Sequence, residues 1–162
     1  MDISTISATA WRLFAWLPGW ALRRFFTQRW LSEHVAIDVR PRHDPVSVMN
    51  DELPESHVWL VVRNDGYFRV ELDRLTVELV LGSAIVRGAH LRRSSLAPGA
   101  TEEVFVRIAL TSAQASHIKR QQAPMYATLQ VMAEFNSKIH AFSKDTGQLS
   151  GIRPDIRLRN DA

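Results

Sequence analysis

The nine residues RLTVELVLG, from Arg74 to Gly82, alternate between two kinds of side chain. One face carries apolar residues, which are Leu75, Val77, Leu79 and Leu81. The opposite face carries polar ones, which are Arg74, Thr76 and Glu78. Because successive side chains of a strand point to opposite faces, the stretch predicts a β-strand with one buried face. Burial on one side only is typical of an antiparallel sheet.

Similar patterns occur upstream of this stretch. Strands are predicted at 35–39, at 58–62 (VWLVV) and at 67–72 (YFRVEL). The triplet Asn64, Asp65 and Gly66 is a turn signal that leads into the last of these. The sequence between 40 and 56 is polar and contains prolines, so we expect a connection there.

Downstream, strands are predicted at 84–91, 103–110, 125–135 and 138–145, the last one ending at Thr146 and Gly147. Two of these strands show clear inward faces, formed by Val104, Val106, Ile108 and Leu110 and by Ala127, Leu129, Val131, Ala133 and Phe135. The segment from Thr111 to Gln122 lacks strand alternation and begins with good helix caps, which predicts a short helical crossover. The tail from Ile152 to Leu158 is expected to be an edge strand, with pairing limited by Pro154. Repeated short strands with one helical insert indicate an all-β sandwich.

Composition limits the number of domains and the kinds of site that the chain can form. The chain has 162 residues, of which 46% are hydrophobic and 23% are charged, and its formal charge is +3. We therefore expect one folded domain, at 34–162, preceded by a separate segment at 1–33. The absence of cysteine excludes disulfides, thiolate catalysis and cysteine-ligated metal sites.

The segment before the strands is unusual in its aromatic and basic content. Between Ile3 and Ser32 the chain has four arginines, no acidic residue and four of its five tryptophans. The uncharged run at 13–22 has ten residues, about half of what a helix needs to cross a bilayer. A cleaved signal peptide fits no better, because Asp2 stands where a basic region is expected. The segment is expected to be retained and to lie on a surface.

Helical periodicity is clearest in the second half of this segment. One face of a single helix would carry Leu22, Phe25, Phe26 and Trp30, and the other would carry Arg23, Arg24, Thr27 and Gln28. Pro18 and Gly19 are expected to separate this helix from an apolar one before it.

Two interpretations of this segment remain open. The aromatic residues lie in a membrane interface with the arginines facing anionic lipid, or they bury against the sandwich, a partner protein or another copy of the chain. The predicted membrane- or partner-binding residues are Trp11, Phe14, Trp16, Leu17, Trp20, Leu22, Arg23, Arg24, Phe25, Phe26 and Trp30.

Signals for catalysis, metals and nucleic acid are weak. The six histidines show no ligand spacing, and His34 with His43 and Asp44 forms only a loose cluster on a polar loop. Glu71 and Asp73 are expected on an exposed strand face rather than in an acid–base site. Few aromatic residues lie within the basic clusters, which disfavours nucleic acid as a partner. The sequence therefore predicts no enzyme and no catalytic, cofactor-binding or metal-binding residues.

The order of motifs from Val58 to Gly147 resembles the type 2 late-embryogenesis-abundant domain, also called the water-stress and hypersensitive-response domain. The matching stretches are VWLVVRND, SAIVRGA, LAPGATEEVFVRIALT, YATLQVMAEFN and KIHAFSKDTG. Members of that family carry asparagine-proline where this chain has Asn64 and Asp65. The resemblance implies an immunoglobulin- or fibronectin-like antiparallel sandwich of about seven strands, often tethered near membranes and without enzymatic activity.

Together these patterns predict a non-enzymatic accessory or binding module with a peripheral, membrane-associated location. In the alternative, the chain is a subunit of an assembly, and its aromatic helix buries in a partner or homo-oligomer interface.

Overall fold

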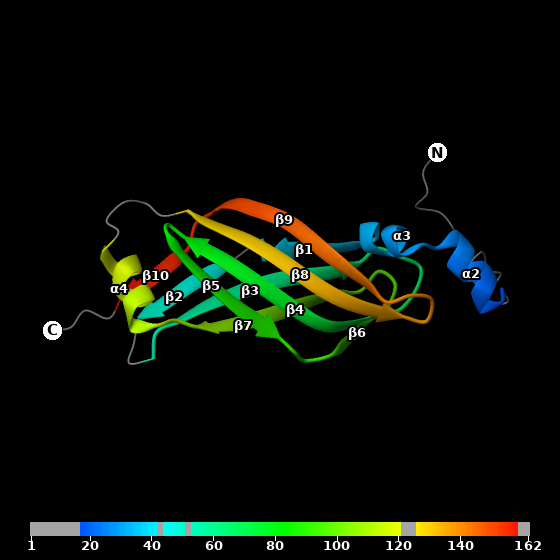
Figure 1. The fold of residues 1–162 in the computed structure, drawn as a ribbon, viewed down its shortest axis with the longest axis horizontal. Helices are drawn as coiled ribbons and strands as arrows, with labels where there is room; N and C mark the ends of the chain where they lie inside the picture. The colour runs from blue at the N-terminus through cyan, green and yellow to red at the C-terminus, as the bar shows by residue number, and fades with distance from the viewer. Residues whose placement is uncertain (1–16, 42–43, 51–52, 121–125, 159–162) are drawn as a thin grey trace.

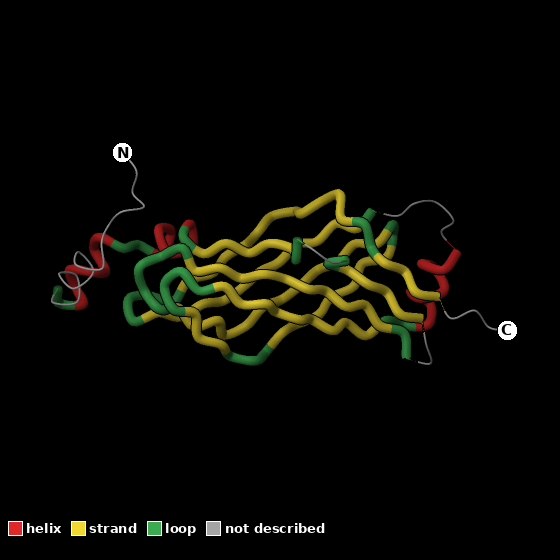
Figure 2. Tube along the Cα trace, turned by 180° about the vertical axis from the view of Figure 1, so that it is seen from behind, coloured by secondary structure: helices red, strands yellow, loops and turns green. Residues whose placement is uncertain are grey.

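The computed structural model describes residues 17–41, 44–50, 53–120 and 126–158. Two five-stranded sheets pack face to face, and their strands run along the long axis of the molecule (Figure 1). The helices of the described residues lie at the two ends of this body (Figure 2). The predicted all-β, mainly antiparallel sandwich is confirmed. Trp11, Phe14 and Trp16 lie outside the described residues.

The elements follow the chain in a simple order. The strands are β1 (Val35–Val39), β2 (Val46–Asn50), β3 (Glu55–Asn64), β4 (Val70–Leu81), β5 (Ala84–His90), β6 (Ser94–Leu96), β7 (Thr101–Ala109), β8 (Ala127–Ser137), β9 (Phe142–Ile152) and β10 (Asp155–Leu158). The described helices are α2 (Gly19–Phe25), α3 (Gln28–Glu33) and α4 (Ser112–Arg120). As predicted, α4 connects the two sheets, because β7 belongs to one sheet and β8 to the other.

The first sheet is organised around β3. One edge of β3 pairs with β7, and the other edge pairs with β1 over one half and with β2 over the other half. Strand β10 then pairs with β2 in parallel and forms the predicted edge. In the second sheet β4 pairs with β8 on one side and with β5 and β6 on the other, and β9 pairs with β8. If β1 with β2 and β5 with β6 each count as one interrupted strand, the two sheets hold the expected seven strands and the tail strand β10.

The core lies between the sheets and uses the side chains that the alternation placed inward. Leu75, Val77, Leu79 and Leu81 of β4 are fully buried, and so are the inward residues predicted for β7 and β8. Burying each of the valine, leucine, isoleucine and phenylalanine side chains among them contributes about 1.5–3 kcal/mol, before the entropy cost of ordering the chain.

The turn between β3 and β4 is built around a buried asparagine. The Nδ2 atom of Asn64 donates to the carbonyl oxygens of Phe68 (2.8 Å) and Leu96 (3.1 Å), and its Oδ1 accepts from the backbone N of Gly66 (3.0 Å). Asp65 then donates its backbone N–H to the carbonyl of His34 at 2.8 Å. Proline has no N–H, so the asparagine-proline pair of the similar family would not form this last hydrogen bond.

Two strand predictions were wrong. Strand β2 lies in the stretch expected to be a connection, where Val46 and Val48 are buried between two partner strands. Strand β9 does not end at Thr146 and Gly147 but continues to Ile152, because Gly147 adopts a φ of 65° within a bulge and pairing with β8 resumes beyond it. A glycine with positive φ signals a bulge as readily as a strand end.

Candidate functional site

The short helices α2 and α3 occupy one end of the long axis, and α4 occupies the opposite end (Figure 1). We call the first of these the helical end and define it as α2, α3, the β3–β4 turn at 64–67 and the β8–β9 loop at 138–141. Both helices are connected to the second sheet through backbone and side-chain hydrogen bonds. Arg23 Nε donates to the carbonyl of Ile139 (3.2 Å), and Lys144 Nζ donates to the carbonyl of Ser32 (2.9 Å).

The chain breaks its helix between α2 and α3, so the single amphipathic helix expected from 22 to 30 is wrong. Phe26 leaves the helical conformation, with φ −108° and ψ 90°, and caps the end of α2. Thr27 then caps α3, because its hydroxyl accepts from the backbone N of Trp30 at 3.2 Å. The predicted interruption at Pro18 does mark the start of α2, since Pro18 is its N-cap residue.

This break divides the predicted binding face into two parts. Leu22 and Phe26 are buried, and Trp30 is partly buried against the core. Phe26 meets Phe68 edge-on at 4.7 Å, and Trp30 stacks on His34 at 3.8 Å between ring centroids. These three residues, which were predicted to bind a membrane or partner surface, therefore pack on the sandwich.

Two large apolar side chains of α2 point away from the core. Trp20 is 73% exposed and Phe25 is 69% exposed, and Leu17, just before the helix, is 36% exposed. Exposed apolar side chains that lie together on a surface are candidates for a binding site, whereas single scattered ones are common. These are the predicted site residues that remain available to a ligand.

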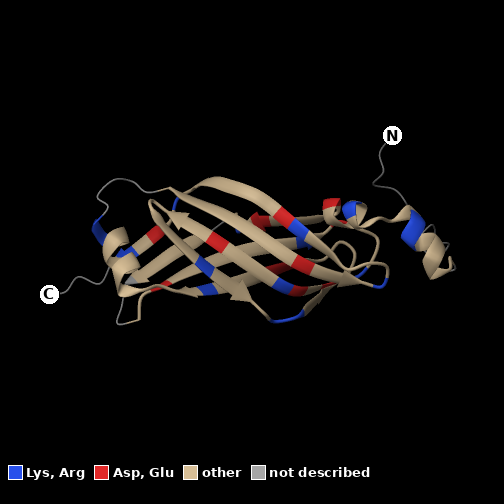
Figure 3. Ribbon diagram, viewed as in Figure 1, with Lys and Arg blue, Asp and Glu red and all other residues tan. Residues whose placement is uncertain are grey.

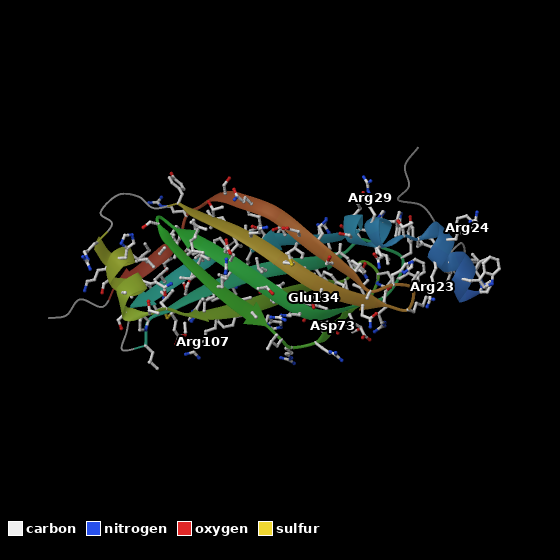
Figure 4. The ribbon with its side chains drawn as sticks, in the orientation of Figure 1. Arg23, Arg24, Arg29, Asp73, Arg107 and Glu134 are labelled. Carbon is white, nitrogen blue, oxygen red and sulfur yellow. The ribbon has the colours of Figure 1, made fainter. Side chains whose placement is uncertain are left out.

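Positive charge accompanies these exposed aromatics. Arg23 and Arg24 lie on α2 at the far end of the molecule (Figures 3 and 4). No carboxylate among the described residues forms an ion pair with either of them, and α2 itself has no acidic residue. Arg29 differs, because it pairs with Glu33 at 2.8 Å, and this hydrogen bond lowers the pKa of the Glu33 carboxyl.

The helices are short. None within the described residues is long and apolar enough to cross a bilayer.

Most of the residues considered above for a catalytic or metal site form contacts with other side chains. Asp73 forms an ion pair with Arg93 at 3.1 Å, and His34 stacks on Trp30. His43 lies outside the described residues, and within them no group of His, Asp or Glu side chains is arranged to hold a metal ion. The Ser83 hydroxyl lies 2.5 Å from Nε2 of His117, and both residues are exposed.

One cluster was missed by the sequence reasoning. His57, Trp59 and Phe105 gather on the outer face of the first sheet, with Trp59 and Phe105 at 5.1 Å between ring centroids. The run VWLVV reads as a strand with both faces buried, which hides the outward position of Trp59. The outward position of Trp59 follows from its place in the strand, because its neighbours Val58 and Leu60 both point inward.

The fold and the helical end together define a β-sandwich module with an exposed aromatic and basic end. No protein-family model matches the chain, and no curated protein matches it.

Solved structures do match. The X-ray structure of a Northeast Structural Genomics Consortium target has 10% sequence identity and a TM-score of 0.52, covering 82% of this chain and 97% of that chain. A Bordetella pertussis protein provisionally assigned as ApaA has 13% identity and a TM-score of 0.49, over 76% of this chain and 95% of that one. The solution structure of a protein provisionally assigned as late embryogenesis abundant has 14% identity and a TM-score of 0.43, over 93% and 89%. The chain is thus loosely similar to such a protein, as the motifs indicated, and likenesses at these identities concern the fold alone.

Proposed function

We propose that this protein is a non-enzymatic accessory module that binds an anionic membrane surface through its helical end. The observation that carries the proposal is the exposure of Trp20 and Phe25 beside Arg23 and Arg24 on one short helix. Tryptophan and phenylalanine enter the interfacial region of a bilayer, and arginine binds the phosphates above it. The sandwich then stands on the membrane as a rigid body and presents its faces to other molecules.

The energies of these contacts are sufficient for reversible binding. Each large apolar side chain contributes about 1.5–3 kcal/mol when it leaves water completely. Each arginine close to an anionic surface adds about 1 kcal/mol, which salt weakens. Apolar and basic contributions are both needed, because stable peripheral binding generally requires two signals.

The test is co-sedimentation of the full chain with vesicles of phosphatidylcholine and phosphatidylglycerol. The double variant Trp20→Ser with Phe25→Ser should weaken vesicle binding by at least about tenfold, because two inserted side chains are lost. A matched control is Leu91→Ser with Tyr126→Ser, which removes side chains that are 68% and 64% exposed but lie away from the helical end. The control should bind as the parent does.

Point variants suit this test better than deletion of 1–33. Leu31 is 2% exposed and Phe26 is 9% exposed, so a deletion would remove part of the core together with the exposed residues. Vesicle binding that is unchanged in the Trp20 and Phe25 variant would contradict the proposal.

The same exposed aromatics also suit a protein interface, since tryptophan and other aromatic side chains are enriched there. In that case the chain is a subunit of an assembly. Sizing of the full chain in detergent-free buffer separates the two functions. A defined oligomer that the Trp20 and Phe25 variant converts to a monomer would support assembly in place of membrane binding.

A further inference from the structure

The outer face of the first sheet contains a groove where its edge strand is interrupted. Strand β1 ends with Val39 opposite Leu60, and β2 resumes with Val46 opposite Val58. Between them Arg40 N donates to the Trp59 carbonyl (3.1 Å), and Trp59 N donates to the Pro45 carbonyl (2.8 Å). A hollow lined by Arg40, Asp44 and residues of β2, β3 and β10 lies beside Trp59 and measures about 700 Å³, within the range of small-ligand sites.

Trp59 lies in the floor of this groove and is fixed by its neighbours. The rings of His57 and Phe105 approach it at 5.7 and 5.1 Å between centroids. His57 is held in turn by Glu55, whose Oε2 lies 3.1 Å from Nε2 of the imidazole. Hydrogen bonds from Arg107 and His57 lower the pKa of the Glu55 carboxyl, which is ionised at neutral pH and accepts from both. The floor is therefore an aromatic platform whose position is set before any ligand arrives.

The rim of the groove carries ion pairs that are already formed. Arg157 pairs with Asp155 at 2.7 Å on one side, and Arg40 pairs with Glu103 at 3.7 Å on the other. An anionic ligand would have to compete with these carboxylates for each guanidinium. A hydroxyl group faces no such competition, because it can donate to a carboxylate and accept from a guanidinium at the same time.

A peptide cannot add to β2 as an extra strand. Strand β2 pairs with β3 on one side and with β10 on the other, so it has no free edge beside the groove. In the groove β2 therefore offers a ligand its side chains.

We propose that this groove binds an uncharged saccharide, whose ring stacks on Trp59 while its hydroxyl groups bond Asp155 and Arg157. The apolar face of a sugar ring matches the indole, and the paired charges of the rim match neighbouring hydroxyls. This site lies on a sheet face and is independent of membrane binding at the helical end.

The test uses ¹⁹F NMR of the full chain labelled with 5-fluorotryptophan, with the Trp59 resonance assigned through Trp59→Phe. Cellotriose, maltotriose and chitotriose are titrated separately to millimolar concentrations, and inorganic phosphate and tetra-alanine serve as comparison ligands. At least one trisaccharide should shift the Trp59 resonance saturably and leave that of Trp20 unchanged. Trp59→Ala should weaken that binding by about tenfold or more, measured by calorimetry.

A second variant keeps the test decisive if Trp59→Ala does not fold. Arg157 has a side chain that is 68% exposed, so Arg157→Ala leaves the core intact and should weaken saccharide binding about threefold through loss of a hydrogen-bond donor. Leu91→Ser, away from the groove, should have no effect. The inference is overturned if no trisaccharide moves the Trp59 resonance, or if only phosphate or the peptide does so.

Discussion

At the scale of single residues, Asn64 shows what the sequence can and cannot predict. The turn was expected from the asparagine, aspartate and glycine in a row. The sequence did not predict that Asn64 is buried and connects two segments, because its side chain donates to Leu96, which lies 32 residues further along the chain. Hydrogen bonds between distant segments leave no periodic pattern in a sequence. The outward position of Trp59 could have been read from alternation, but its groove could not, because β2 and β10 form two of its sides.

Replacing Asn64 tests this connection. Asn64→Ala leaves the carbonyls of Phe68 and Leu96 and the N–H of Gly66 without their buried partner. The free energy of unfolding should fall by about 2–4 kcal/mol, measured in urea. The exposed Asn136→Ala should change it by less than about 0.5 kcal/mol. Equal values for the two variants would mean that the Asn64 hydrogen bonds do not stabilise the fold.

At the scale of elements, the strands were easier to predict than the helices. Alternation of side chains located β4, β7 and β8, and the continuous apolar run VWLVV located β3; each of these strands buries one whole face. Strand β2 is short and follows a proline, and half of its pairing comes from the distant β10, so local pattern was insufficient. The helix break at Phe26 was missed for the same reason, because it also depends on a contact with a distant segment. Contact of Phe26 with Phe68 decides the path of the chain there, and helical periodicity does not record such a contact.

The cap of α3 is the local signal that favours this break. Thr27→Ala removes the hydroxyl that accepts from Trp30 N, so the free energy of unfolding should fall by about 1 kcal/mol. Thr27→Ser retains an acceptor and should preserve most of the stability. Thermal unfolding followed by circular dichroism measures both variants. If alanine and serine give the same midpoint as threonine, the cap does not determine where α3 begins.

At the scale of the whole molecule, two surfaces formed by the described residues are candidates for binding. One is the helical end, and the other is the groove bordered by β2 and β10, which lie toward the opposite end (Figure 1). This separation means that a membrane bound at the helical end would leave the groove accessible. Sequence reasoning found the aromatic and basic segment but placed Leu22, Phe25, Phe26 and Trp30 on one face of a helix. Only the packing of Leu22, Phe26 and Trp30 on the sandwich distinguishes the side chains that remain available.

The membrane depth of α2 tests the central claim most directly. Because the chain has no cysteine, Phe25→Cys provides a unique position for a nitroxide label. On binding to phosphatidylglycerol-containing vesicles, this label should become more accessible to oxygen and less accessible to a nickel chelate, as measured by power-saturation EPR. A label introduced by Leu91→Cys should keep the accessibility that it has in solution. If the label at position 25 also stays as accessible to the nickel chelate as in solution, α2 does not enter the membrane interface and the account is contradicted.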